Sequence, residues 1–179
     1  MNRDHEPLAK KISLNVVIFM VALLAAGAMI PSRFAVTLTP SLEKRVFLIT
    51  DRNPSAGVEN GDYVMFSMSR VLERNQTLRE LFRKKLGPVE DVPLVIKRVS
   101  CLEGQDLRQD GRSYFCNGRF IGTARERSSS GDPLEQFEYN GKVPAGYVFV
   151  TGDHNDSCDS RYFGFVSVGD IHAKVHALF

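Results

Sequence analysis

The sequence contains no tryptophan, only four histidines and only three cysteines among its 179 residues. Cys101, Cys116 and Cys158 form no Cys-x-x-Cys pair, which argues against a structural zinc site. The chain has 23 lysine and arginine residues and 21 aspartate and glutamate residues, which gives a net charge of +2. This small charge does not produce the strong positive potential that attracts nucleic acid. There is also no zinc-finger or helix-turn-helix signature and no internal repeat. We therefore expect no bound metal, no cofactor and no nucleic-acid partner.

A long uncharged segment lies near the N-terminus, at residues 12–30 (ISLNVVIFMVALLAAGAMI). Its length approaches the ~20 residues that cross a bilayer. Basic residues precede it, and the positive-inside rule therefore keeps the N-terminus in the cytoplasm. We expect a cytoplasmic N-terminus over 1–11, a transmembrane anchor over 12–30 and an external domain over 31–179. The alternative is a signal peptide cleaved near Ala26-Gly27-Ala28, which also leaves the domain outside the cytoplasm.

That location bears on the cysteines, because a pair can be oxidised outside the cytoplasm. Cys101 and Cys116 flank a stretch rich in turn residues and are the better candidates for a disulfide. Three buried thiols are the alternative, since sequence alone cannot fix connectivity.

The external domain has the pattern of many short strands separated by turns, and its apolar residues can fill a core. Strands are predicted for Phe34–Thr39, Arg45–Thr50, Tyr63–Met68, Val92–Ser100, Tyr147–Thr151, Val166–Val168 and Ile171–Leu178. Turn signals lie at Asn60-Gly61, Asp110-Gly111, Asn117-Gly118 and Asn140-Gly141. We expect a mainly β, antiparallel domain, with residues 102–146 forming an insertion rich in β-hairpins.

Residues 69–86 differ, because their apolar side chains recur at mostly helical spacing and basic side chains fill the other faces. Gly87-Pro88 ends the pattern. The segment predicts a short amphipathic helix. Its basic face either contacts water or lies on anionic lipid beside the anchor.

A nucleophilic serine needs a base, and no Gly-x-Ser-x-Gly elbow or obvious serine–histidine pair is present, although His154 in a polar loop stays open. A lysine can serve as this base if burial lowers its pKa. An unperturbed lysine is only ~0.1% neutral near pH 7.5. Lys97 lies in the apolar stretch VPLVIKRV, whereas Lys44, only three residues from Ser41, is a weaker candidate. Because strand side chains alternate, Arg98 should point to the opposite face from Lys97.

The segment Gly152–Gly164 (GDHNDSCDSRYFG) closely resembles the signature G-D-N-x-x-x-S-x-D-S-R-Y-F-G of the signal peptidase I family. Gly61-Asp62-Tyr63-Val64 and Ile96-Lys97-Arg98-Val99 resemble two further motifs of that family, in the same order. Thr39-Pro40-Ser41-Leu42 is similar to the T-x-S-[ML] nucleophile motif of the TraF peptidase branch, which occurs in conjugative DNA transfer. The resemblance covers nearly the whole chain and implies a signal-peptidase-like antiparallel β fold.

The resemblance also implies a role for each matching residue. Ser41 would be the nucleophile and Lys97 the general base, with Thr39 and the Ser41 N–H forming the oxyanion hole. The remaining matches imply that Ser157 orients the lysine, that Asp159 and Arg161 form a structural ion pair, and that Gly152 lets the backbone pass close to the lysine.

The chain departs from the family pattern just after the nucleophile, where Glu43 and Arg45 replace the usual proline and glycine. The signature of residues 152–164 is also one residue shorter than in the housekeeping enzymes. Ser55, in Asn53-Pro54-Ser55, is therefore a competing nucleophile, although it lacks the T-x-S context.

The resemblance implies a membrane-bound serine endopeptidase of the bacterial inner membrane, with a periplasmic catalytic domain. Its partners would be the bilayer and a membrane-inserted preprotein, the pilin precursor of a conjugative type IV secretion system, with ring closure of the pilin as a variant outcome. The alternatives are a general leader peptidase and a non-catalytic periplasmic assembly component. A self-cleaving repressor would need a DNA-binding domain where this chain has the apolar segment.

Overall fold

The computed structural model describes residues 17–20, 25, 27, 33–37, 41–52, 57–74, 76, 78–80, 83 and 94–178. The chain divides into two units, Met1–Phe34 and Ala35–Phe179. In the first unit, residues 17–20 are helical and their apolar side chains are exposed. Among the described residues, no helix is both long and apolar enough to span a bilayer. Most of the anchor predicted over residues 12–30 lies outside the described residues.

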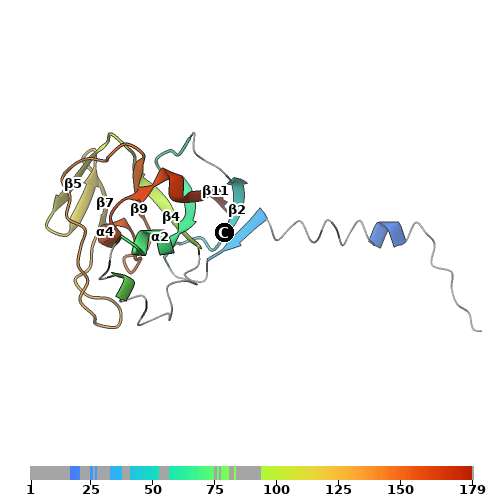
Figure 1. Ribbon diagram of the computed structural model, residues 1–179, viewed down its shortest axis with the longest axis horizontal. Coiled ribbons are helices and arrows are strands. Elements are labelled where there is room, and N and C mark those ends of the chain that lie inside the picture. The colour runs from blue at the N-terminus through green and yellow to red at the C-terminus, as the bar shows by residue number, and fades with distance from the viewer. Residues whose placement is uncertain are drawn as a thin grey trace, which may run out of the picture. The chain divides into compact units, whose positions relative to one another are not determined.

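The second unit contains a seven-stranded sheet and a four-stranded sheet (Figure 1). The larger sheet has the order β1 (Phe34–Val36), β2 (Val46–Asp51), β11 (Ile171–Ala177), β3 (Tyr63–Ser67), β4 (Leu94–Cys101), β9 (Tyr147–Thr151) and β10 (Val166–Ser167). The smaller has the order β7 (Arg119–Thr123), β6 (Ser113–Cys116), β5 (Asp106–Asp110) and β8 (Gly141–Lys142). From β2 to β10 and throughout the smaller sheet, neighbouring strands are antiparallel, which confirms the predicted mainly β class.

Side-chain alternation gives the larger sheet an apolar cluster on each face. In β3, the buried side chains of Val64 and Phe66 belong to the larger cluster, together with Val99 and Phe149. The intervening residues of β3 pack against a smaller cluster, which contains Leu42, Phe47, Ile49, Ile96, Ala173 and Val175. The central strand β4 contributes to both clusters, so its side chains are buried on both faces of the sheet.

The smaller sheet occupies the middle of the stretch in which the sequence predicts hairpins. The turn from β6 to β7 is Asn117-Gly118, where both residues have positive φ, at 47° and 78°. Asparagine and glycine tolerate this geometry, which matches the twist of a two-residue hairpin. The turn signal in the sequence therefore places this hairpin correctly.

The continuous helix predicted over residues 69–86 is wrong within the described part of the chain. Helix α2 covers only Met68–Leu72, and the Arg74 N–H donates to the Val71 carbonyl in a tighter turn. This turn allows Arg74, with Arg70, to pair with the carboxylate of Asp170. Helical geometry returns at residues 76, 78–80 and 83. The described apolar residues of this segment, Val71, Leu72 and Leu78, are buried, whereas contact of the basic face with lipid stays a prediction.

A disulfide joins the two sheets. It links Cys101, the last residue of β4, to Cys116, the last residue of β6, with 5.6 Å between their Cα atoms. The bond therefore ties the smaller sheet to the strand that carries Lys97.

We predict that replacing both Cys101 and Cys116 by serine lowers the free energy of unfolding by about 3 kcal/mol, because the sequence separation of 15 residues sets the loop-closure entropy. Denaturant unfolding of the full chain measures this change, and reduction of the wild type is the matched control. Equal stability of the oxidised wild type and the double variant would contradict the prediction.

Candidate active site

The amine of Lys97 lies inside the molecule. Lys97 is opposite Val64 of β3 in the sheet register, and the same face of β4 carries Val99 of the larger apolar cluster. Only 4% of Lys97 is exposed. The apolar context that singled out this lysine in the sequence therefore corresponds to real burial.

Burial lowers the pKa of Lys97, because the charged ammonium loses more hydration than the neutral amine. The negative charge of Asp159 acts in the opposite direction but is the smaller influence. The Lys97 Nζ donates a hydrogen bond of 2.9 Å to the Ser157 Oγ, which fixes where the amine points. A neutral amine held in this way can accept a proton from a nearby hydroxyl.

The backbone of Ser41 lies beside the loop that carries Ser157. The His154 N–H donates to the Ser41 carbonyl at 3.2 Å. A Cβ atom added to Gly152 would lie 2.6 Å from that carbonyl oxygen and would collide with the Ser157 side chain. Ser41 and Ser157, the hydrogen-bond partner of Lys97, therefore meet at Gly152, where only a residue without a side chain fits.

Thr39 and Ser55 lie outside the described residues, so the structure does not test the predicted oxyanion threonine or the competing serine.

An ion pair buried between β9 and the smaller sheet holds the loop that carries Ser157. The Arg161 Nε and Nη2 donate to the two carboxylate oxygens of Asp159 at 2.8 and 2.6 Å, and neither residue is more than 2% exposed. The Arg161 Nη1 also donates to the Thr123 carbonyl of β7 at 2.7 Å. The Gly152 N–H donates to Asp159 at 2.8 Å. Breaking such a buried pair by removing one partner costs about 3–5 kcal/mol, so the loop is held firmly.

Asp159 also caps a helix, a role that the sequence analysis did not predict. It caps the short helix α4 (Ser160–Phe163) by accepting the Arg161 N–H at 3.1 Å. The Val150 N–H of β9 donates to the Ser160 Oγ at 2.9 Å, which docks the helix onto the sheet. An aspartate before a short polar-to-aromatic run is a helix-start signal, and it could have revealed this helix.

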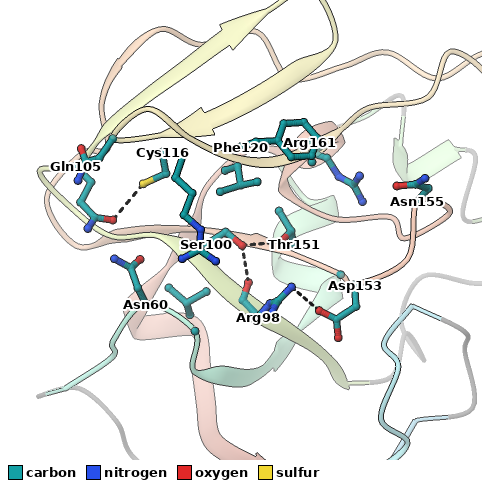
Figure 2. A pocket seen from close by; sticks show the side chains of 17 residues that line it. Asn60, Arg98, Ser100, Gln105, Cys116, Phe120, Thr151, Asp153, Asn155 and Arg161 are labelled. Atoms are coloured by element: carbon teal, nitrogen blue, oxygen red, sulfur yellow. Dashed lines mark hydrogen bonds and ion pairs between the residues drawn. The ribbon is translucent and has the colours of Figure 1, made fainter.

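Arg98 and Asp153 form a second ion pair, which the sequence analysis did not predict. The Arg98 Nη2 lies 2.7 Å from the Asp153 Oδ1, and the Tyr63 hydroxyl donates to the Asp153 Oδ2 at 3.2 Å. Burial and the negative Asp153 both raise the pKa of Tyr63. Figure 2 shows Arg98 directed at Asp153. The partner of Arg98 could not be read from spacing, because the two residues are 55 positions apart.

The other candidate bases are less suitable. His154 is exposed, its Nδ1 accepts the Asp156 N–H at 3.1 Å, and its backbone N–H donates to the Ser41 carbonyl. His172 and His176 are exposed on β11, and Lys44 is exposed as well. Within the described ranges, no group of three or more His, Cys, Asp or Glu side chains could hold a metal ion.

Comparison with known proteins shows the family of the chain. The family model of signal peptidase, peptidase S26, matches residues 8–179. The chain belongs to this signal peptidase family. The resemblance seen in the sequence motifs is therefore confirmed at the level of the family.

Its relatives include a probable conjugal transfer protein TraF of Sinorhizobium fredii, 30% identical over 77% of this chain and 72% of that protein. Subunit 1 of the mitochondrial inner membrane protease of Mus musculus is 34% identical over 37% of this chain and 40% of its own length. Signal peptidase I of Bacillus caldolyticus is 33% identical over 45% of this chain. The chain spans half of the Bacillus protein.

A crystal structure of a signal peptidase I from Enterococcus faecalis matches with a TM-score of 0.40 and 22% identity, over 69% of this chain and 98% of that one.

We predict that Gly152→Ala lowers the free energy of unfolding by about 1–3 kcal/mol, because the new methyl group must displace Ser157 or the Ser41 carbonyl. Gly169→Ala is the matched control, since its methyl group would meet only the Ser167 Oγ at 3.6 Å. Denaturant unfolding of both variants measures the difference. Equal stabilities would show that the contacts at Gly152 are not close.

Proposed function

We propose that this protein is a serine endopeptidase in which Ser41 is the nucleophile and Lys97 the general base, acting on a membrane-inserted preprotein. The observation that carries the proposal is the buried Lys97 amine, hydrogen-bonded to Ser157 at the place where Ser41 and Gly152 meet. Membership of the signal peptidase family supports the same chemistry.

In the first step, the neutral Lys97 Nζ takes the proton of the Ser41 hydroxyl as its oxygen attacks the scissile carbonyl. The Ser41 N–H and the Thr39 hydroxyl donate to the developing oxyanion, which can contribute ~10²–10³ in rate for a single donor. The lysine then gives its proton to the departing amine. An ester between Ser41 and the substrate remains.

In the second step, Lys97 takes a proton from a water molecule, which attacks the ester and releases the acid product. Ser41 recovers its proton and the lysine returns to its neutral form. Ser157 holds the amine in place through both steps, and the Asp159–Arg161 pair holds Ser157. A buried neutral lysine therefore performs the task that histidine performs in other serine peptidases.

We further propose that the substrate is the pilin precursor of a conjugative transfer system. The support is the relative described as a probable conjugal transfer protein TraF, which aligns over most of this chain. If the amino terminus of the pilin replaces water in the second step, the product is a closed ring and not a linear chain. A general leader peptidase is the second candidate, favoured by the signal peptidase I relative.

The proposed location is the bacterial inner membrane, with the N-terminus in the cytoplasm and the catalytic domain in the periplasm. The uncharged residues 12–30 and the basic residues before them support this topology. The exposed apolar side chains of the described residues 17–20 suit contact with lipid. A non-catalytic assembly component would share this location, and the changes at Glu43 and Arg45 are the observation that favours it.

The test is processing of a co-expressed candidate prepilin, measured by intact mass. We expect Ser41→Ala and Lys97→Arg to reduce processing to background, because the first removes the nucleophile and an arginine cannot deprotonate. Ser55→Ala and Lys44→Arg are the matched controls and should process normally. A product ~18 Da lighter than the linear chain would reveal ring closure, since one water is not added.

Normal processing by Ser41→Ala would contradict the assignment. In that case, loss of activity in Ser55→Ala would make Ser55 the nucleophile. Activity in neither the wild type nor any variant, with any of the tested prepilins, would favour the assembly component.

A further inference from the structure

A polar cleft of about 500 Å³ opens beside the candidate site. One side is formed by β4 and β9, with Arg98, Ser100 and Thr151, and the other by β7, with Phe120. Figure 2 shows Phe120 and Arg98 on opposite sides of it. The roles proposed above for Ser41 and Lys97 do not use this cleft.

The cleft reaches the backbone beside the place where the chemistry would occur. Gly152 lines it, and a Cβ atom on Gly152 would approach both the Ser41 carbonyl and Ser157. Asp153 and Asn155, which follow in the same loop, line it as well. A peptide that leaves the site past Gly152 would therefore enter the cleft.

The wall formed by β7 suits an extended peptide. Among the strands that the structure describes, β7 is the outer strand of the smaller sheet and pairs with β6 alone, and its residues Arg119–Gly122 line the cleft. An outer strand presents backbone groups with which an extended chain can pair. The Phe120 side chain, 56% exposed, adds apolar surface on the same wall.

The charges in the cleft are not balanced. Arg98 pairs with Asp153 and Arg161 with Asp159. Arg119 is exposed and forms no ion pair with any residue that the structure describes. Its positive charge is therefore available to a negative group on a ligand.

The chemistry indicates which part of a substrate passes Gly152. Lys97 must return its proton to the departing amine, so that amine lies beside the Lys97 Nζ and its partner Ser157. The chain that begins at this amine would pass Gly152, which lines the cleft. Because acyl transfer is reversible, an amine that attacks the acyl-enzyme would approach by the same route.

We propose that this cleft binds the substrate segment that follows the scissile bond, and that Arg119 selects an acidic side chain within it. The proposal rests on the proposed function and extends it to the specificity of the enzyme. In a ring-closing reaction, the incoming amino-terminal segment of the substrate would occupy the same cleft.

The test uses the full chain in detergent micelles and two free-amine peptides, Ala-Glu-Asp-Gly-Ser-Ala and Ala-Lys-Lys-Gly-Ser-Ala, with binding followed by backbone amide chemical shifts. We expect the acidic peptide to bind about fivefold more tightly, since one exposed ion pair changes affinity by only a few-fold. The shift changes should concentrate on residues 119–122 and 151–155. Arg119→Glu should reverse the preference, whereas Arg79→Glu, an exposed arginine outside the cleft, should leave it unchanged.

Equal binding of the two peptides, or a preference that survives Arg119→Glu, would overturn the proposal. Shift changes confined to other surfaces would overturn it as well. Binding does not require the Ser41 hydroxyl, so the same titration with Ser41→Ala separates the two levels of inference. Charge-blind binding by an active peptidase removes the cleft proposal alone. Charge-selective binding by a chain that processes nothing removes the peptidase, and with it the assignment of the bound segment to a scissile bond, and leaves only a peptide site.

Discussion

An ammonium group that enters the interior of a protein loses hydration worth several kcal/mol, and the neutral amine loses much less. Lys97 is under this constraint, because it lies on a central strand with apolar neighbours and is almost fully buried. The amine donates to the hydroxyl of Ser157, and Asp159, the carboxylate that most raises the pKa of Lys97, is engaged with Arg161. In the proposed function, these contacts favour the neutral amine and fix where it points.

Asp159 organises the loop, and its negative charge favours the charged form of Lys97. The bidentate contacts from Arg161 fix the position of the carboxylate, and the positive charge of Arg161 partly offsets this effect by lowering the pKa of Lys97. Arg161 in turn reaches the Thr123 carbonyl of β7, so the smaller sheet helps to hold the loop. The Cys101–Cys116 disulfide ties that sheet back to β4, the strand that carries Lys97.

Several features of the structure could be predicted from the sequence. The apolar context of Lys97 predicted its burial, and the alternation of strand residues predicted that Arg98 points elsewhere. The strands of the larger sheet were placed to within about two residues, apart from β1, because turn dipeptides and β-branched residues mark their ends. The roles of Ser41, Lys97 and Ser157 came from resemblance to a family and stay predictions.

Other parts depend on contacts between distant residues, and no local pattern encodes them. The helix predicted over residues 69–86 breaks after Leu72 within the described residues, where Arg74 pairs with Asp170, which is 96 positions away. The partner of Arg98 and the cleft beside Gly152 likewise appear only when β4, β7 and β9 come together. Thr39 and Ser55, on which part of the catalytic assignment depends, lie outside the described residues.

The central claim is that the Lys97 amine is neutral at a pH where an ordinary lysine is charged, and its titration tests this claim directly. The full chain would carry lysine labelled with ¹³C at Cε, and the spectrum of Lys97→Arg would identify the Lys97 signal. Because burial disfavours the charged form, the account predicts that this signal titrates below the ordinary lysine pKa of ~10.4. A Lys97 signal that titrates at or above that ordinary value would contradict the account.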